Sequence, residues 1–177
     1  EGPRRLAPDR AAALVAAVPG AVTVAVMVAP DPAESLALAR AIGAGRVQLH
    51  RVDAAAWPID YPLPATFAVP MDAEGHLEGA LPPEGRLVLL DLAHAVLAGG
   101  TGQTVPWTHA AALARGLPLM LAGVLGPDFV AEAIRTVNPW GVDASSRLES
   151  SPGVKDHDLV RRYVAAARAA FERNLHG

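Results

Sequence analysis

The feature that most constrains this chain is the repeated alternation of short apolar runs with helix-forming segments. The clearest apolar run is residues 86–91, Arg-Leu-Val-Leu-Leu-Asp, where consecutive apolar residues predict a strand buried on both faces. Asp91 ends this run, and in parallel α/β folds the carboxyl ends of the strands are where substrates bind. On position alone, Asp91 fits a site residue and a turn-capping residue equally well.

The other segments extend the same pattern along the chain. We expect Asp31 and Thr108 to be helix N-caps. Three prolines between residues 58 and 64 prevent a long helix there, and residues 72–81 have room for a brief helix at most. The sequence predicts further strands at 21–28, 46–50, 66–71, 117–123 and 140–146, and helices at 10–18, 32–43, 108–115, 126–137 and from 156 onward.

The order of these segments predicts the architecture. Six strand-then-helix units in strict alternation, preceded by one helix, predict a parallel sheet in a single domain that spans residues 1–177. An eight-stranded (β/α)8 TIM barrel needs about 200 residues or more, and two further strands and one helix at the front would supply the difference. Residues 1–5 read like the middle of a loop, so we expect these N-terminal strands to be missing from the sequence. A doubly wound open sheet is the alternative on pattern alone.

Composition restricts the class of protein. A hydrophobic content of 51% excludes a disordered chain, and no apolar run approaches the roughly 18 to 20 residues that span a bilayer. The net charge of −3 gives no support for a nucleic-acid partner. The absence of cysteine excludes disulfides and thiol catalysis within these residues, and it fits a cytosolic protein. We therefore expect a globular, cytoplasmic protein with no membrane and no nucleic-acid partner.

Polar and glycine residues gather at the predicted carboxyl ends of the strands. Glycine turns at such ends let backbone N–H groups approach an anion, and barrels commonly bind phosphate in the loops after their last two strands. Taken singly, the glycine loop at 99–102 also fits a flexible turn, and His50 also fits a structural residue. The other histidines show no metal-ligand spacing, so we predict no metal site. The candidate site residues are His50, Asp91, Gly99, Gly100, Gly123, Asp143, Ser145 and Ser146.

Several motifs follow one another along the chain. They are Val-Gln-Leu-His at 47–50, Leu-Leu-Asp at 89–91, Gly-Gly-Thr-Gly at 99–102 with Trp107, Leu-Ala-Gly at 121–123, Val-Asp-Ala-Ser-Ser at 142–146 and Pro-Gly-Val-Lys-Asp at 152–156. In this order and at this spacing they resemble the phosphoribosylanthranilate isomerase family of tryptophan biosynthesis. The resemblance extends from Pro3 and Arg4 to the last helix.

This resemblance implies an enzyme, an aldose–ketose isomerase built as a β/α barrel. It would convert N-(5-phosphoribosyl)anthranilate to 1-(2-carboxyphenylamino)-1-deoxyribulose 5-phosphate by an Amadori rearrangement, without metal or organic cofactor. Asp91 matches the family's acid, which protonates the ribose ring oxygen and is kept partly protonated by apolar surroundings. Arg4 matches the arginine that pairs with the anthranilate carboxylate. The loops around Gly123 and Ser145-Ser146 match the phosphate site, and residues 99–102 match the active-site loop.

The chain departs from the family pattern at several of these positions. The family's proton-abstracting cysteine lies on a first strand, in a Lys-Ile-Cys-Gly stretch, which this sequence does not contain. Val124 and Arg147 replace glycines of the phosphate loops, so we expect a distorted N–H cradle. Arg147 would then offer a cation to the phosphate or fill the pocket. Arg51 replaces a glycine after the histidine, and Val105-Pro106 replaces a Phe-Asp pair.

Three hypotheses for the function follow from these observations. The first is an isomerase of this family, whose partner is a small phosphorylated substrate. The second is a diverged barrel that acts on a different aminosugar or on a non-phosphorylated compound. The third is a catalytically dead barrel that serves as a binding or assembly module, fused to or associated with other tryptophan-pathway enzymes.

Overall fold

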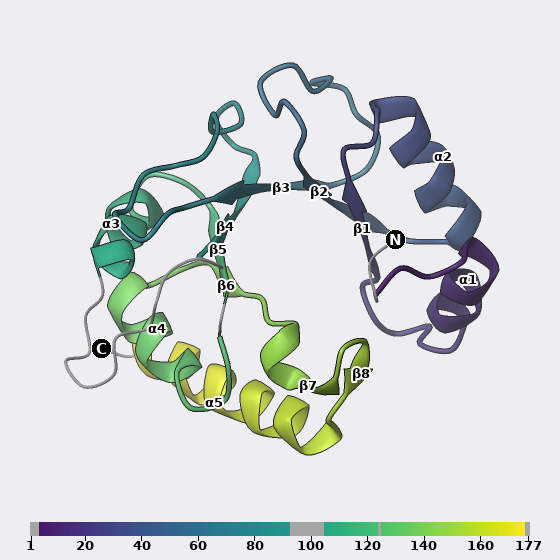
Figure 1. The fold of residues 1–177 in the computed structure, drawn as a ribbon. Helices are drawn as coiled ribbons and strands as arrows, with labels where there is room; N and C mark the ends of the chain where they lie inside the picture. Colours follow the sequence, from purple (N-terminus) through teal and green to yellow (C-terminus); the bar gives the residue numbers. More distant parts are fainter. Residues whose placement is uncertain (1–3, 93–104, 124, 176–177) are drawn as a thin grey trace. The chain divides into compact units, whose positions relative to one another are not determined.

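The computed structural model describes residues 4–92, 105–123 and 125–175 (Figure 1). The chain divides into two compact units. Unit 1 lies within Glu1–Val69 and Ala80–Val88, and unit 2 lies within Pro70–Gly79 and Leu89–Gly177.

Unit 1 packs helices against parallel strands. It contains α1 (Pro8–Ala16), β1 (Val24–Val28), α2 (Pro32–Ile42), β2 (Arg46–His50), most of β3 (Ala65–Pro70) and the first part of β4 (Leu87–Asp91). β1 pairs with β2 in parallel, with Val28 opposite His50, and β2 pairs with β3 in parallel. The core of this unit consists of Ala25, Met27, Ala39, Ala44, Val47, Leu49, Ala54, Trp57 and Phe67.

The ends of α2 and the start of the last helix follow from single residues. The side chain of Asp31 accepts the N–H of Glu34 at 2.7 Å, which confirms Asp31 as an N-cap. Gly43 ends α2 at φ +75°, a left-handed conformation that favours glycine. Asp156 accepts the N–H of Leu159 at 3.1 Å and so starts the last helix, as predicted.

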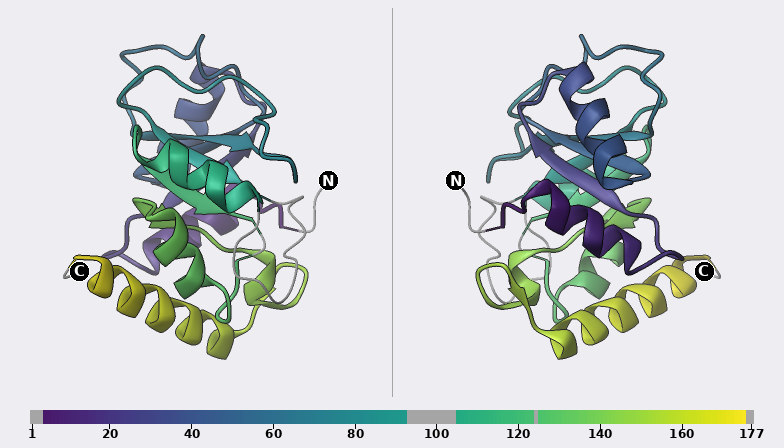
Figure 2. Two further views of the ribbon diagram at one scale, coloured as in Figure 1. Left: turned by 90° about the vertical axis from the view of Figure 1, so that its left-hand side faces the viewer. Right: turned by 90° about the vertical axis from the view of Figure 1, so that its right-hand side faces the viewer.

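Unit 2 packs three helices around a larger apolar core. It contains the rest of β4, then α3 (Val105–Ala114), β5 (Leu119–Ala122), α4 (Val130–Val137), β6 (Gly141–Val142), the 3₁₀ turn η1 (Ser146–Leu148), β7 (Glu149–Ser151), β8 (Val154–Lys155) and α5 (His157–Leu175). β5 and β6 pair in parallel, and α4 packs against both α3 and α5 (Figure 2). No helix in the described part of the chain is long and apolar enough to cross a membrane.

The six strands from β1 to β6 pair in their sequence order, and β4 carries residues of both units. Val88, Leu89 and Leu90 of β4 are at most 1% exposed, as expected of a strand covered on both faces. The chain is therefore an α/β protein with a parallel six-stranded sheet, which confirms the predicted α/β class and parallel sheet. An eight-stranded barrel whose N-terminal strands are missing from this sequence stays a prediction. A single barrel domain over residues 1–177 stays a prediction.

Strict alternation of strands and helices is wrong at two places. Neither the β2–β3 connection, residues 51–64, nor the β3–β4 connection, residues 71–86, contains a helix. Prolines interrupt the first connection, because they lack the N–H that a helix needs. In the second, the Oδ1 atom of Asp72 accepts the N–H of Glu74 at 3.0 Å and that of His76 at 2.8 Å, which closes a tight turn instead of a helix.

Several predicted element boundaries are also wrong, and β1, for example, begins at Val24 instead of residue 21. α3 begins at Val105, so Thr108 lies inside the helix and is not its N-cap. Pro106 in the first turn suits such an early start. α4 begins at Val130 instead of residue 126. β6 covers only Gly141–Val142, because only these residues pair with β5 before the chain turns into η1.

Candidate functional site

Asp91 is the last residue of β4, and its backbone is held from two sides in unit 2. Its carbonyl oxygen accepts the N–H of Met71 at 3.0 Å, and the next residue, Leu92, donates its N–H to the carbonyl oxygen of Ala122 at 3.1 Å. The Asp91 side chain is half-buried, whereas Leu90 and Leu92 are at most 1% exposed. The candidate acid therefore stands at the carboxyl end of a buried strand, between two buried leucines.

The carboxyl ends of β4, β5 and β6 are neighbours. The N–H of Asp143, which follows β6, donates to the carbonyl oxygen of Leu121 in β5 at 2.8 Å, and the end of β5 also receives the N–H of Leu92. Gly123, directly after β5, has a φ of +85°, a conformation that residues with a side chain rarely adopt. Asp91, Gly123 and Asp143 are thus brought to one edge of the sheet.

The loops after β5 and β6 touch at Gly126 and Arg147. A Cβ atom on the buried Gly126 would lie 3.4 Å from Cβ and 3.9 Å from Cγ of Arg147. Because Gly126 has no side chain, the stem of Arg147 packs against the backbone of the preceding loop. Arg147 is exposed and makes no hydrogen bond or ion pair with another residue that the structure describes. The two loops expected to hold phosphate therefore share a contact and present a cation.

The ammonium group of Lys155, in β8, holds the loop after β6. Its Nζ atom donates to the carbonyl oxygen of Ser145 at 2.9 Å, to the hydroxyl oxygen of Ser145 at 3.3 Å and to Oε1 of Glu149 at 2.8 Å. The Glu149 side chain is 4% exposed, whereas that of Lys155 is 42% exposed. A carboxylate buried to this degree needs a paired cation. Lys155 thus connects the exposed Ser145 to a buried charge.

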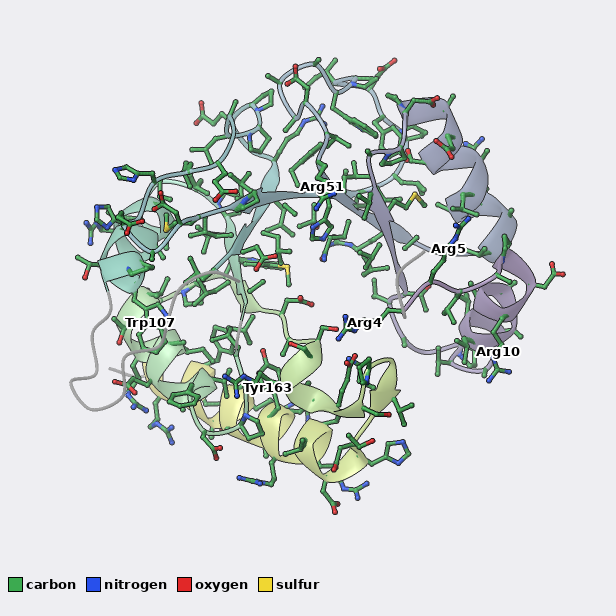
Figure 3. The ribbon with its side chains drawn as sticks, in the orientation of Figure 1. Arg4, Arg5, Arg10, Arg51, Trp107 and Tyr163 are labelled. Carbon is green, nitrogen blue, oxygen red and sulfur yellow. The ribbon has the colours of Figure 1, made fainter. Side chains whose placement is uncertain are left out.

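Tyr163 of α5 lies buried in unit 2 (Figure 3). It is 7% exposed, and its hydroxyl has no hydrogen-bond partner among the residues that the structure describes. Burial raises the pKa of Tyr163, and the nearby charge of Asp143 raises it further. The hydroxyl is therefore a neutral, unsatisfied polar group close to a candidate site residue.

His50 ends β2 in unit 1, and its ring contacts the side chain of Gln48. The two Nε2 atoms are 3.3 Å apart. Because an amide nitrogen can only donate, this contact is a hydrogen bond when the imidazole Nε2 carries no proton. Gln48 is buried and His50 is half-buried. The Val-Gln-Leu-His motif therefore places two polar side chains on the same side of β2.

Arg51 borders a pocket of about 320 Å³ in unit 1, at the end of β2 (Figure 3). Its φ of +56°, like the +50° of Ala29, lies in the left-handed region, where residues with a side chain are strained. Asp53 shapes the next turn, because its Oδ1 atom accepts the N–H of Ala55 at 3.0 Å. The other residues that line the pocket are Pro30, Pro32, Val52, Ala56 and Trp57.

The remaining candidate residues are placed as follows. Arg4 is exposed in a turn before α1, in unit 1, and Ser146 is exposed at the start of η1, in unit 2. Gly99 and Gly100 lie outside the described residues. Across residues 4–92, 105–123 and 125–175, no group of three or more His, Asp or Glu side chains could hold a metal ion.

The sequence analysis did not name as site residues four residues that the structure places beside the candidate site. They are Gly126, Glu149, Lys155 and Tyr163. For Lys155 the sequence does hold one signal of a special role, because it is the only lysine of the chain. The contacts of Gly126 and Tyr163 are with residues about twenty positions away, and Glu149 contacts Lys155 across the β7–β8 hairpin.

Comparison with known proteins gives a consistent result. The family model described as N-(5'-phosphoribosyl)anthranilate (PRA) isomerase matches residues 1–166. An N-(5'-phosphoribosyl)anthranilate isomerase of Haloferax volcanii is 42% identical over 175 residues, which cover 95% of this chain and 78% of the relative. The enzyme of the same name from a Roseiflexus species is 42% identical over 180 residues, covering 96% of this chain and 84% of the relative.

Solved structures agree with the sequence comparison. Phosphoribosylanthranilate isomerase from Thermotoga maritima superposes with a TM-score of 0.78 at 28% identity, covering 96% of this chain and 84% of that chain. A phosphoribosylanthranilate isomerase in complex with reduced 1-(o-carboxyphenylamino)-1-deoxyribulose 5-phosphate gives a TM-score of 0.77 at 27% identity, covering 96% and 83% of the two chains.

Proposed function

The chain belongs to the N-(5'-phosphoribosyl)anthranilate isomerase family, and on that premise we propose that its site catalyses the Amadori rearrangement of N-(5-phosphoribosyl)anthranilate. The product is 1-(2-carboxyphenylamino)-1-deoxyribulose 5-phosphate, an intermediate of tryptophan biosynthesis. The family model covers residues 1–166, and the two relatives described above carry this name at 42% identity.

One observation carries the proposal furthest. Asp91 ends a buried strand, and the ends of β4, β5 and β6 are adjacent through the N–H groups of Leu92 and Asp143. A carboxyl group at this edge is well placed to act on a substrate whose phosphate lies in the loops after β5 and β6.

In the proposed reaction Asp91 is the general acid. It gives its proton to the ribose ring oxygen as the bond from that oxygen to C1 breaks, and the electron pair of the anthranilate nitrogen forms an iminium ion with C1. Loss of the C2 proton then gives the enolamine, which tautomerises to the ketose. The sequence contains no cysteine, so the removal of the C2 proton is not assigned to one of its residues.

The remaining roles concern substrate binding. We assign Arg4 to the anthranilate carboxylate, because a guanidinium fits a carboxylate with two parallel hydrogen bonds. Gly123, Ser145, Ser146 and Arg147 are assigned to the phosphate, with the Arg147 cation acting in addition to the backbone N–H groups of these loops. His50, Gly99, Gly100 and Asp143 are proposed as further substrate contacts. The cytoplasmic location and an association with other tryptophan-pathway enzymes stay predictions.

The test is consumption of phosphoribosylanthranilate by the protein and its Asp91→Asn variant. Asparagine keeps the size of the side chain and cannot donate an acidic proton, so we expect kcat to fall at least about 100-fold. Asp128→Asn is the matched control, because Asp128 is exposed and, among the residues that the structure describes, pairs only with Arg162 at the surface. Full activity of Asp91→Asn would exclude Asp91 as the acid, and an inactive parent protein would exclude the reaction.

A related substrate is the second candidate, and Arg51 is the observation that favours it. A strained arginine beside a pocket adds bulk and charge where the family usually has glycine. Titration with inorganic phosphate separates the two candidates. Millimolar or tighter binding supports the phosphorylated substrate, whereas no binding supports a non-phosphorylated one.

A further inference from the structure

Lys155 uses all of its hydrogen-bonding capacity within the protein. An ammonium group has three donors, and Nζ of Lys155 contacts three acceptors, the carbonyl and hydroxyl oxygens of Ser145 and Oε1 of Glu149. Of the 15 lysine and arginine residues in the chain, this is the only lysine. A planar guanidinium cannot direct three donors to acceptors grouped around one point. The residue type therefore matches the local geometry.

The charge of Lys155 is already balanced. Its partner Glu149 lies opposite it in the β7–β8 hairpin, and the Glu149 side chain is 4% exposed. The next residue, Asp156, donates its N–H to the carbonyl oxygen of Leu148 at 2.9 Å, which closes the base of the hairpin. Lys155 therefore connects Ser145 to Glu149, and its ammonium is not a free cation for the substrate.

The contact with Ser145 fixes the orientation of one peptide group. The Ser145 carbonyl oxygen accepts the Lys155 ammonium at 2.9 Å and the N–H of Leu148 at 3.1 Å. In a planar trans peptide the carbonyl of one residue and the N–H of the next point in opposite directions. Hence the two donors to Ser145 also direct the N–H of Ser146, which has no acceptor among the residues that the structure describes.

We propose that Lys155, held by the buried carboxylate of Glu149, is a positioning residue that keeps the Ser146 N–H directed at the substrate phosphate. The inference rests on the proposed function, since it assigns the 145–147 turn to phosphate. Lys155 acts through Ser145 and Ser146 and does not touch the substrate. Preorganised N–H donors bind anions because their orientation costs nothing at the moment of binding.

The experiment compares the parent protein with Lys155→Met, Lys155→Arg and the double variant Lys155→Met/Glu149→Gln. Loss of a positioning contact is expected to weaken inorganic phosphate binding and to raise KM about tenfold, with kcat changed less than about threefold. Lys155→Arg keeps the charge and loses the three-acceptor geometry, so it should behave like Lys155→Met. The double variant leaves no unpaired buried charge and keeps the test valid if Lys155→Met does not fold.

Arg161→Met is the matched control, because within the described part of the chain Arg161 forms only an exposed ion pair with Asp158. Unchanged phosphate affinity in folded Lys155→Met or in the double variant would overturn the inference, and so would full affinity in Lys155→Arg, which would indicate a role of charge alone. A parent protein that binds no phosphate overturns the inference as well. Activity of the parent protein tests the proposed function separately, so an active parent with an unaffected Lys155→Met refutes only the positioning role.

Discussion

The backbone of Gly126 lies against the side-chain stem of Arg147, so that a Cβ atom on Gly126 would be 3.4 Å from the Cβ of Arg147. Valine adds two γ-carbons beyond that point, and they would displace the stem and the loop after β6. We expect Gly126→Val to lower stability by about 1–3 kcal/mol and to weaken phosphate binding about tenfold. Thermal unfolding and phosphate titration measure the two effects.

Two comparisons isolate this contact. Gly116→Ala is the control, because the nearest atom to a Cβ there is 3.9 Å away. In Gly126→Val/Arg147→Ala the crowded stem is shortened, so part of the lost stability should return. A double variant no more stable than Gly126→Val would show that the two residues are not coupled.

The exposed guanidinium of Arg147 should act directly on the phosphate. We expect Arg147→Ala to raise KM about tenfold and to make phosphate affinity less sensitive to ionic strength, because a charge-assisted contact is lost. Phosphate titrations at low and high salt measure both effects. The control is Arg135→Ala, which removes an exposed cation from α4. Equal salt dependence in the parent and in Arg147→Ala would rule out this role.

Those parts of the structure that depend on local chemistry were predictable. The N-cap of α2 at Asp31, its end at Gly43 and the buried centre of β4 follow from neighbouring residues. The short β6 was not predictable, because its length depends on its pairing with β5, which lies about twenty residues earlier in the chain.

In the candidate site, too, some features follow from local sequence and others from contacts elsewhere in the fold. Position at a strand end singled out Asp91 and Asp143, and both end up at one edge of the sheet. The role of Gly126 comes from a contact between two loops. That of Glu149 comes from its burial and its ion pair across the β7–β8 hairpin, and neither is visible in the sequence.

Removal of the buried Tyr163 hydroxyl should stabilise the fold. The group has no hydrogen-bond partner among the described residues, and a buried unsatisfied hydroxyl costs about 1–3 kcal/mol. We expect Tyr163→Phe to raise the melting temperature, whereas Tyr163→Ala should lower stability by about 3–5 kcal/mol through the cavity it creates. A lower melting temperature for Tyr163→Phe would mean that the hydroxyl does have a stabilising partner.

Tyr163 also predicts how the stability of the fold changes at alkaline pH. Burial and then the charge of Asp143 raise the pKa of Tyr163 above its usual value of 10.0. The unfolded chain therefore releases this proton at lower pH than the folded chain, and the associated stability is present below pH 10 and is lost as the pH rises further. Between about pH 8 and pH 11, the difference in stability between the parent and Tyr163→Phe should stay constant up to about pH 10 and grow above it, because only the parent loses this contribution. Parallel curves would refute the assignment.

The turn after β3 predicts how the stability of the fold changes in acid. The backbone N–H of His76 lowers the pKa of Asp72 below 3.8, and the His76 side chain and the N–H of Glu74 add to this effect against desolvation. Because the folded pKa is depressed, the contribution of Asp72 to stability is present above pH 3.8 and is lost as the pH falls below it. Asp72→Asn should therefore melt lower than the parent near neutral pH, and the difference should shrink in acid. Asp60→Asn, at an exposed carboxyl, is the control, and a constant difference would contradict the prediction.

Gly75 in the same turn combines two constraints that a side chain would violate. Its φ is +90°, and a Cβ atom there would clash with the ring of His109 in α3. Gly85 has a similar φ of +83°, and no atom of the described residues beyond its chain neighbours lies within 4 Å of a Cβ there, so Gly85→Ala measures backbone strain alone. We expect Gly75→Ala to cost about 1–3 kcal/mol of unfolding free energy and Gly85→Ala about 1 kcal/mol, measured by denaturant titration. In Gly75→Ala/His109→Ala the clash is removed and only the strain remains. Equal losses in Gly75→Ala and Gly85→Ala would show that the ring moves aside and that packing on His109 does not restrict this turn.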